Sequence, residues 1–444
     1  MELETIQCED ARLGTIYYQK RDGFFKDVMM QDSWTYCTIG DLEAKGEAEI
    51  KTGPFGTQIK ASEYVESGVP MINARNIGFR EVRREKLEYL SEETVSRLSS
   101  HLLKPGDIVF GRKGSVERHV LITEECNHWF QGTDCLRLRM MSLSIDNSFL
   151  SYSFLIEDHQ LWMMNQSSHG ATMTSLNQDI IRRIPLWLPP LQVQKRIAGI
   201  LSAYDELIEN SQRRIRILEE MARALYREWF VLFRFPGHEN FPLVASSLGE
   251  IPKGWEVKKL ADLISYNRRA TKPGLHLVDR RYVPIDCIPS KSLVLLDAKP
   301  IEEAQSSLQL FEKGDILFGA MRPYFHKVVV APFTGVTRTT CFVFKPAHPQ
   351  WHSFATLTAF DEGTVAYATA HSQGATIPYA VWDGSLAEMP LSLPPDALLR
   401  MFDNVVAPIL AKLSQSFFKL SNLRRTRDLL LPRLLSGEVN LKKN

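Results

Sequence analysis

The sequence predicts an α+β protein in which two mixed α/β domains are separated by two long antiparallel coiled-coil helices, with a pseudo-two-fold internal repeat. Two observations support this fold class. Residues 185–190 read Pro-Leu-Trp-Leu-Pro-Pro and residues 390–395 read Pro-Leu-Ser-Leu-Pro-Pro, a shift of 390 − 185 = 205 residues. After each Pro-Pro pair, apolar residues recur at steps of four and three, which is the coiled-coil period. A repeat of this kind indicates a molecule built from two related halves.

Length and composition are those of an ordinary globular protein. With 444 residues, 44% apolar and 24% charged, the chain is expected to form two or three domains. No apolar run reaches the roughly 18–20 residues that span a bilayer, and the acidic N-terminus lacks the apolar core of a signal peptide. Six scattered cysteines without a Cys-x-x-Cys pair argue against a zinc site or a disulfide framework, and favour a reducing, cytoplasmic location.

The order of patterns along the chain suggests seven segments. Short β-rich runs, such as 107–110 and 119–122, alternate with turn signals in the first mixed domain, and a helical stretch is expected around 147–164. Breakers and weak periodicity mark a linker in mid-chain. The predicted segments are an N-terminal arm (1–33), the first domain (34–184), a helical region (185–234), the linker (235–254), the second domain (255–389), a second helical region (390–435) and a tail (436–444).

The two mixed domains repeat each other as well. Residues 104–111 read Lys-Pro-Gly-Asp-Ile-Val-Phe-Gly and residues 313–319 read Lys-Gly-Asp-Ile-Leu-Phe-Gly. In both, the aspartate (Asp107 or Asp315) is expected to cap local backbone. The first copy is longer, with most of its extra length near residues 50–84. We therefore expect one scaffold carrying two different sets of loops.

The long helices are expected over roughly 191–230 and 396–430, with Pro432 ending the second and Pro408 kinking it. Each carries an apolar stripe whose burial, at about 25 cal/mol per Å², outweighs surface charge effects. Antiparallel pairing suits a two-fold relation. Charged residues on the outer faces, such as Arg216, Glu219 and Glu220, are left for solvent or for partner subunits. The expected pairing residues are Ile197, Leu201, Tyr204, Ile208, Ile215, Leu218 and Leu225 on the first helix, and Phe402, Val406, Ile409, Leu413, Leu420 and Leu423 on the second.

Glycine-punctuated loops in both domains carry polar and basic side chains. Arginine pairs with guanine, and asparagine or glutamine with adenine, at base edges in the major groove. These loops could therefore contact DNA, although solvated, phosphate and base-contacting roles all stay open for each residue. The candidates are Thr57, Gln58, Lys60, Arg75, Asn76, Arg112, Lys113, Arg118 and His119 in the first domain, and Arg268, Arg269, Lys272, Arg280, Arg281, Arg322, Tyr324, His326, Lys327 and Arg338 in the second.

Recognisable catalytic motifs are missing. The sequence has no Gly-x4-Gly-Lys-Ser/Thr phosphate loop and no Asn-Pro-Pro-Tyr or Asp-Pro-Pro-Tyr methyltransferase motif. Asp286 with Asp297 and Lys299 has the residue types of a nuclease site, at a loose spacing that arises often by chance. The eleven histidines form no ligand-spaced cluster. We expect no catalytic residue, no metal and no cofactor bound by this chain.

Several stretches resemble one known family, the specificity subunits of type I restriction–modification systems. Residues 53–64, Gly-Pro-Phe-Gly-Thr-Gln-Ile-Lys-Ala-Ser-Glu-Tyr, with Gly-Val-Pro-Met-Ile-Asn-Ala-Arg-Asn-Ile at 68–77, resemble the start of a target-recognition domain. Residues 184–201 and 221–230, preceded by Gly-Ala-Thr at 170–172, resemble the family's central conserved region. Residues 423–438 resemble its C-terminal end. One departure is Asp-Ala-Leu-Leu-Arg at 396–400, where the first copy has Leu-Gln-Val-Gln.

The resemblance implies two target-recognition domains, each reading half of an asymmetric bipartite site in double-stranded DNA, with the paired helices fixing the spacing. It implies two methyltransferase subunits docked around the helices, which hold S-adenosylmethionine and methylate adenine, and motor–nuclease subunits that join for cleavage. Two alternatives stay open. The near-neutral net charge of +1 permits a coiled-coil interaction scaffold without DNA binding, and a self-contained restriction endonuclease or methyltransferase is disfavoured by the missing motifs.

Overall fold

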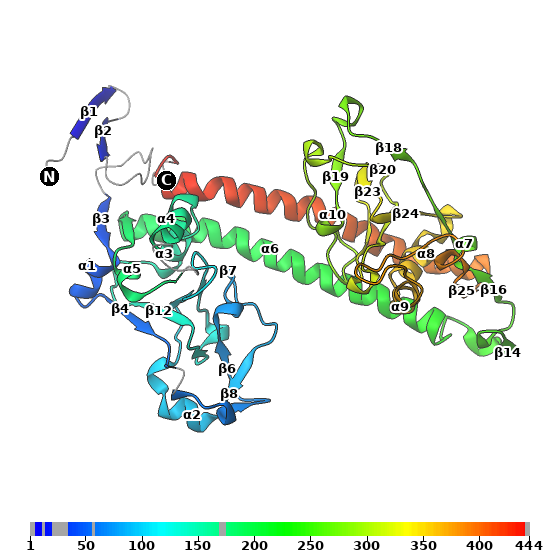
Figure 1. Ribbon diagram of the computed structural model, residues 1–444, viewed down its shortest axis with the longest axis horizontal. Coiled ribbons are helices and arrows are strands. Elements are labelled where there is room, and N and C mark those ends of the chain that lie inside the picture. Colours follow the sequence, from blue (N-terminus) through cyan, green and yellow to red (C-terminus); the bar gives the residue numbers. More distant parts are fainter. Residues whose placement is uncertain (1–4, 11–13, 20–33, 56–57, 168–174, 440–444) are drawn as a thin grey trace. The chain divides into compact units, whose positions relative to one another are not determined.

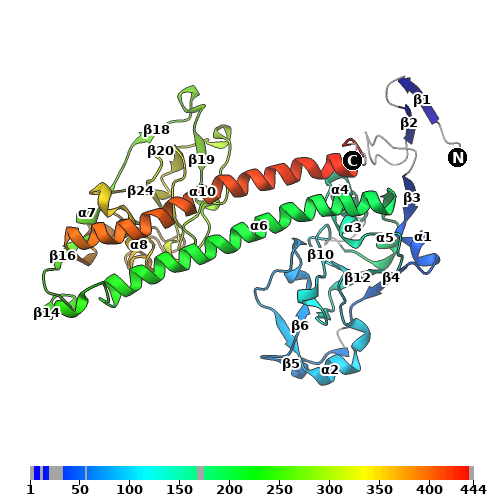
Figure 2. The same ribbon diagram turned by 180° about the vertical axis from the view of Figure 1, so that it is seen from behind.

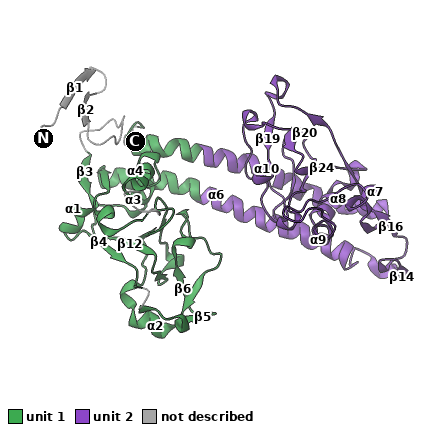
Figure 3. Cartoon of the chain, in the orientation of Figure 1, with its two compact units in different colours: residues 1–205, 426–444 green, residues 206–425 purple. Residues whose placement is uncertain are grey.

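The computed structural model describes residues 5–10, 14–19, 34–55, 58–167 and 175–439 (Figure 1). It divides into two compact units, which Figure 3 colours separately. Unit 1 contains residues 1–205 and 426–444, and unit 2 contains residues 206–425. Both long helices are shared, because each contributes one end to each unit. In the segment expected to be a weakly patterned arm, β1 (Thr5–Asp10) pairs antiparallel with β2 (Gly14–Gln19).

Unit 1 contains a five-stranded and a four-stranded sheet, with a two-stranded sheet where the domain leads into its long helix. The five-stranded sheet has the order β4 (Ala48–Thr52), β12 (Cys135–Met140), β9 (Ile108–Gly111), β10 (His119–Leu121), β7 (Phe79–Arg80). The four-stranded sheet has the order β11 (Phe130–Gln131), β6 (Val69–Ile72), β8 (Glu88–Leu90), β5 (Tyr64–Val65), and the small sheet pairs β13 (Pro185–Leu188) with β3 (Thr35–Thr38).

Short helices complete the unit. The helical stretch expected around 147–164 consists of two helices, α3 and α4, because Phe154 ends the first and the second begins at Glu157. Side-chain caps start several of these helices; Thr38, for example, accepts from the backbone of Asp41 at 3.1 Å. The helices are α1 (Ile39–Ala44), α2 (Glu92–Arg97), α3 (Asn147–Ser153), α4 (Glu157–Ser167) and α5 (Gln178–Arg182).

Unit 2 repeats this layout with two four-stranded sheets and two small ones. The linker expected at 235–254 is not irregular throughout, since it forms a hairpin of β14 and β15 and buries Phe235 and Ile251. One sheet has the order β17 (Ile264–Tyr266), β24 (Cys341–Pro346), β21 (Ile316–Gly319), β22 (Val328–Val330), and the other β18 (Ala270–Thr271), β20 (Leu308–Phe311), β23 (Gly335–Arg338), β19 (Arg281–Val283). The small sheets are β14 (Leu243–Ser246) with β15 (Gly249–Pro252), and β16 (Glu256–Lys259) with β25 (Pro390–Leu393), and the helices are α7 (Leu260–Leu263), α8 (His352–Phe360) and α9 (Glu362–Ala370).

The duplication read from the sequence extends to strand order and direction. The order β4-β12-β9-β10 in unit 1 corresponds to β17-β24-β21-β22 in unit 2, with antiparallel neighbours throughout. The parallel pair β11 and β6 corresponds to the parallel pair β23 and β19. Even the turns match: the carboxylates of Asp107 and Asp315 each accept a backbone N–H three residues earlier at 2.8 Å. The predicted α+β class with an internal repeat is confirmed, as is the capping role of both aspartates.

The two long helices, visible from both sides in Figures 1 and 2, are α6 (Leu191–Tyr226) and α10 (Asp396–Leu435). A π-helical turn, Arg227–Val231, continues α6. The expectation that Pro432 ends the second helix is wrong, because a proline removes one donor but the turn around it still forms, and α10 runs through Pro408 and Pro432 to Leu435.

Within each unit, the two helices contact each other as antiparallel helices do: the start of one lies beside the end of the other. In unit 1, Ile197 and Leu201 near the start of α6 share a cluster with Leu434 and Leu435 at the end of α10. In unit 2, the Trp229 ring beyond the end of α6 lies 5.4 Å from that of Phe402 near the start of α10. Of the stripe residues, Ile197, Leu201, Ile208, Ile215, Phe402, Val406, Leu413 and Leu420 are buried, and Tyr204, Leu218, Leu225, Ile409 and Leu423 are half-buried.

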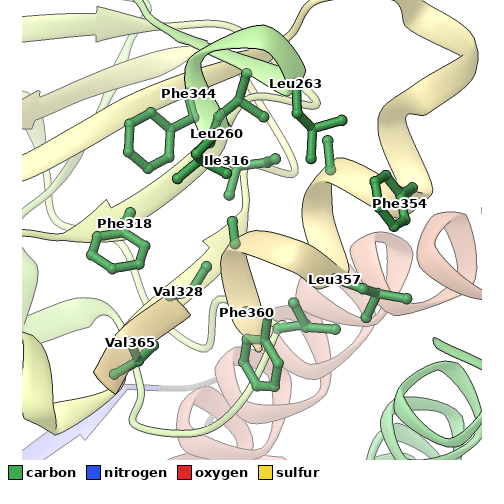
Figure 4. Packing of buried hydrophobic residues seen from close by; sticks show 14 of the residues in the cluster. Leu260, Leu263, Ile316, Phe318, Val328, Phe344, Phe354, Leu357, Phe360 and Val365 are labelled. Carbon is green, nitrogen blue, oxygen red and sulfur yellow. The ribbon is translucent and has the colours of Figure 1, made fainter. Parts of the chain in front are cut away.

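The buried stripe of α10 is wider than the period of four and three predicts. Leu410 and Phe417 are buried although neither lies on the predicted stripe. Phe417 belongs to the cluster of β-strand residues that includes Leu317 and Val343, so α10 packs against the sheet of unit 2 as well as against α6. Figure 4 shows part of another cluster of this unit, which includes strand residues such as Phe318 and helical residues such as Phe354.

Candidate nucleic-acid interface

The loops that carry most first-domain candidates meet at one end of the five-stranded sheet. Gly111, the last residue of β9, lies opposite Cys135, the first of β12, and the last residue of β4 is opposite Leu136. The backbone N–H of Arg112 donates to Asp134 at 2.8 Å, which holds the β9–β10 loop against the start of β12. Residues remote in sequence, Gly53, Arg112 and the Asp134–Cys135 pair, are therefore adjacent in space.

Most candidates at this sheet end reach solvent. Lys60, Arg75 and Lys113 are exposed, and Arg112 and Arg118 are half-buried. Gln58 is exposed but uses its side-chain oxygen locally, accepting from the backbone of Phe55 at 3.0 Å. Arg75 forms an ion pair with Glu88. Arg118 lies over the ring of Phe79, with 5.5 Å between its guanidinium carbon and the ring centroid. Thr57 and the Gly-Ala-Thr stretch at 170–172 lie outside the described residues.

Two first-domain candidates are wrong, because the fold buries them. The Asn76 side chain is fully buried and donates to the backbone oxygens of Arg83 and Glu85 at 2.9 and 3.2 Å, so it closes a loop and has no free edge for a base. His119 is also fully buried, 2.9 Å from the Ser151 hydroxyl through Nε2. Burial lowers the pKa of His119 to about 3, so this imidazole carries no charge at neutral pH.

In unit 2, some of the second-domain candidates lie at the equivalent end of the sheet. Gly319, the last residue of β21, lies opposite Cys341 and donates its N–H to the backbone of Lys327 at 2.7 Å. The loop that follows Gly319 holds Arg322 and the exposed Tyr324. Arg338, exposed at the end of β23, lies three residues before Cys341. This arrangement reproduces the convergence of loops seen in unit 1.

Other second-domain candidates lie elsewhere or are already engaged. His326 is a wrong candidate: it is buried, and its Nε2 lies 2.8 Å from the backbone oxygen of Phe360. Burial also lowers the pKa of His326. Lys327 is half-buried and donates to the backbone of Ile285 at 2.8 Å. Arg268 forms an ion pair with Asp383. Arg269 and Arg280 lie 3.2 and 3.9 Å from the carboxylate of Glu312. Arg281 is exposed and lies over the rings of Phe333 and Phe417. Lys272 is exposed.

A feature that the sequence could not show is a set of unmet hydrogen-bond donors at these sheet ends. The Nε atoms of Arg112 and Arg322 are buried and find no acceptor among the described residues. Arg322 also has φ of +51°, a left-handed backbone that a residue with a side chain seldom adopts. Buried donors are nearly always satisfied in native proteins. The two arginines lie in corresponding loops of the two units, after β9 and after β21.

The outer faces of the long helices carry apolar as well as charged residues. On α6, Leu207, Ile217 and Met221 are each nearly half exposed, and their spacing of ten and four residues puts them on one face. On α10, Met401 and Val405 are similarly exposed. Glu219, expected on the outer face, is instead buried: its carboxylate accepts from the Ser292 hydroxyl and the Leu293 backbone, both at 2.7 Å. Burial raises the pKa of Glu219.

Two other features, a metal-ligand cluster and a membrane-spanning helix, are absent from the described part of the chain. No group of three or more histidine, cysteine, aspartate or glutamate residues there is arranged to hold a metal ion. No helix in the same residues is both long and apolar enough to cross a bilayer. A groove of about 640 Å³ in unit 2 is lined by residues that include Arg223, Arg227 and Phe360.

Comparison with known proteins agrees with this architecture. Residues 32–220 match the family model described as the type I restriction modification DNA specificity domain. The type I restriction enzyme MjaIX specificity subunit of Methanocaldococcus jannaschii is 25% identical over 430 residues, covering 92% of this chain and 94% of that protein. The MjaVIII specificity subunit of the same organism is 28% identical over 159 residues, covering 36% and 32%.

A solved structure shares the fold. The S subunit of the type I restriction–modification system from M. genitalium has a TM-score of 0.58 to this chain at 15% identity, and the alignment covers 94% of this chain and 98% of that one. The class is thus that of a duplicated protein with two α/β domains and two long helices. By these comparisons, the chain is similar to the specificity subunits of type I restriction–modification systems.

Proposed function

We propose that this chain is the non-catalytic, sequence-reading subunit of a type I restriction–modification complex. Each α/β domain acts as a target-recognition domain and reads one half of an asymmetric bipartite site in double-stranded DNA. The observation that carries the proposal is the repeated sheet end, where corresponding loops hold different polar side chains. Unit 1 presents Lys113 and Arg118 in its β9–β10 loop, whereas unit 2 presents Tyr324 in the corresponding β21–β22 loop and Arg338 at the end of β23. One scaffold with two different loop sets suits two different half-sites.

Energetics explain why two domains serve better than one. A mismatched base pair costs about 1–3 kcal/mol, so a half-site of a few base pairs is discriminated weakly by itself. Two half-sites read together add their discrimination only when both domains engage at one spacing. In the proposal, α6 and α10 set this spacing, because helices packed through a continuous apolar stripe resist bending and sliding.

The exposed apolar residues of the helices support a second part of the proposal. Leu207, Ile217 and Met221 form an apolar face on α6 that the described residues leave uncovered. Two methyltransferase subunits dock around the helices at such faces. They supply S-adenosylmethionine and methylate adenine, while motor–nuclease subunits join for cleavage, all in the cytoplasm. The chain itself binds no cofactor and contributes specificity.

Mapping of methylated adenines in cells tests the proposal. Cells that express the methyltransferase partner with this chain should show one bipartite methylated motif, and cells without this chain should show none. Unchanged methylation in the absence of the chain would contradict the proposal and favour an interaction scaffold. Methylation or metal-dependent cleavage by the purified chain alone would instead favour a self-contained enzyme.

A change in helix length tests the proposed role of the helices. We would insert seven residues after Glu206 in α6 and seven after Arg424 in α10, which lengthens each helix by about 10 Å. The tolerated spacer should change while both half-sites keep their sequences. Altered half-site letters with an unchanged spacer would show that the helices do not set the spacing.

A further inference from the structure

A charged network in unit 1 joins the first recognition domain to both long helices. Asp205 of α6 accepts hydrogen bonds from the Tyr152 hydroxyl of α3 at 2.5 Å and from Arg427 Nη1 of α10 at 2.8 Å. Arg80 of β7 completes the network: its guanidinium carbon lies 3.4 Å from the centroid of the Tyr152 ring, and its Nε lies 3.9 Å from the Asp205 carboxylate. Asp205 therefore bonds to the domain and to the opposite helix at once.

The network includes an unfavourable backbone conformation and a largely buried charge, both at Arg80. Arg80 is a residue with a side chain in the left-handed region, with φ of +65°. Its side chain is only 14% exposed and also donates to the Ser148 backbone oxygen at 3.0 Å. Tyr152 is fully buried. A strained backbone and a buried guanidinium persist only where surrounding groups hold them in one arrangement.

The internal repeat provides a comparison within the same molecule. A shift of 205 residues maps Tyr152 onto Leu357 and Asp205 onto Leu410, and the reverse shift maps Arg427 onto Ala222. All three counterparts are apolar and share one buried cluster of unit 2. In unit 2, a polar contact between the domain and a long helix lies at another position, where the Ser353 hydroxyl of α8 donates to Asp403 of α10. The same position in the fold is thus ionic in one half and hydrocarbon in the other.

Stability does not account for this difference, because apolar side chains packed in place of a buried ion pair are often as stabilising or more so. Geometry does account for it. Charge-assisted hydrogen bonds require defined distances and angles, whereas an apolar contact tolerates small rotations. We infer that Asp205 is a positioning residue that holds the first recognition domain at one angle on the helix pair and thereby narrows the DNA spacers that the complex accepts. This inference rests on the proposed function.

The test uses the full chain assembled with its methyltransferase partners, once the wild-type methylated motif is known. The substrates are duplexes with both half-sites at the native spacer, one base pair shorter and one base pair longer. The variants are Asp205→Asn, Tyr152→Phe and, as a matched control on α6, Glu209→Gln, whose carboxylate is exposed. Loss of a hydrogen bond to a charged group, at about 1.5–3 kcal/mol, predicts that Asp205→Asn raises the ratio of off-spacer to native-spacer methylation by about tenfold or more.

Tyr152→Phe should raise this ratio less, and Glu209→Gln should leave it unchanged, with the half-site letters the same in all variants. An unchanged ratio in assembled Asp205→Asn complexes would overturn the inference, since a merely structural role would alter stability without altering spacer choice. If Asp205→Asn does not fold, the same ratio measured for Tyr152→Phe decides the question. A wild-type complex without any bipartite motif would refute the proposed function itself, which is a separate outcome.

Discussion

Phe402 offers the sharpest test of how the second helix packs. Its side chain is 1% exposed, and its ring lies 4.6 Å from the ring of Phe230 and 5.4 Å from that of Trp229. These aromatic partners follow the end of α6, whereas Phe402 lies near the start of α10. The substitution Phe402→Ala therefore removes a contact between the two helices within unit 2.

The expected cost follows from the burial. A buried phenylalanine covers about 150–250 Å², which at about 25 cal/mol per Å² corresponds to about 4–6 kcal/mol of burial free energy. The methyl group that remains and the higher helix propensity of alanine recover part of this. Phe402→Ala should therefore lower the free energy of unfolding by about 3–5 kcal/mol.

Met401→Ala is the matched control, because this neighbouring side chain on the same helix is 46% exposed. It should change the free energy of unfolding by less than about 0.5 kcal/mol. The assay is urea denaturation of the whole chain followed by tryptophan fluorescence, since Trp229 reports on the same cluster. Equal effects of the two substitutions, or a loss below about 1 kcal/mol for Phe402→Ala, would refute the packing described for α10.

Three further predictions concern the polar groups that the fold buries or exposes. Glu219→Ala should cost about 1–3 kcal/mol in thermal or urea unfolding, because it leaves the Leu293 N–H without its acceptor, whereas Glu220→Ala on the exposed face should cost almost nothing. Burial lowers the pKa of His119 from 6.5 to about 3. Below pH 6.5 the unfolded chain binds a proton at this histidine that the folded chain does not bind, so the free energy of unfolding should fall as the pH drops. The fall should be less steep in His119→Asn. Lys113→Ala, at an exposed position, should weaken DNA binding and reduce its salt dependence without changing the melting temperature. Asn76→Ala, at a buried position, should lower the melting temperature. The opposite pattern would contradict the placement of these two side chains.

Local patterns predicted the parts of this protein that depend on near neighbours. The shift of 205 residues revealed the duplication, and the steps of four and three placed eight buried stripe residues, from Ile197 to Leu420. The Gly-Asp-Ile turns were predictable for the same reason, because Asp107 and Asp315 bond to backbone only three residues away.

The loops were less predictable, because an asparagine, histidine or lysine in a glycine-rich loop has the same composition whether it contacts solvent or the interior. Asn76 is buried by the backbone of residues 83–85, and His119 by Ser151 of a later helix. Nothing near these residues in the sequence distinguishes them from Lys113, which is exposed.

By itself, the sequence determined that this chain has two related halves, each with an α/β domain and a long amphipathic helix, because periodicity and repetition are written in the order of residues. Only the tertiary structure decided which loop residues are exposed to solvent and that Asp205 connects Tyr152 to Arg427. The physical reason is distance along the chain: Asp205 and Arg427 are 222 residues apart, and burial and charge pairing arise from neighbours that the fold, not the sequence, brings together.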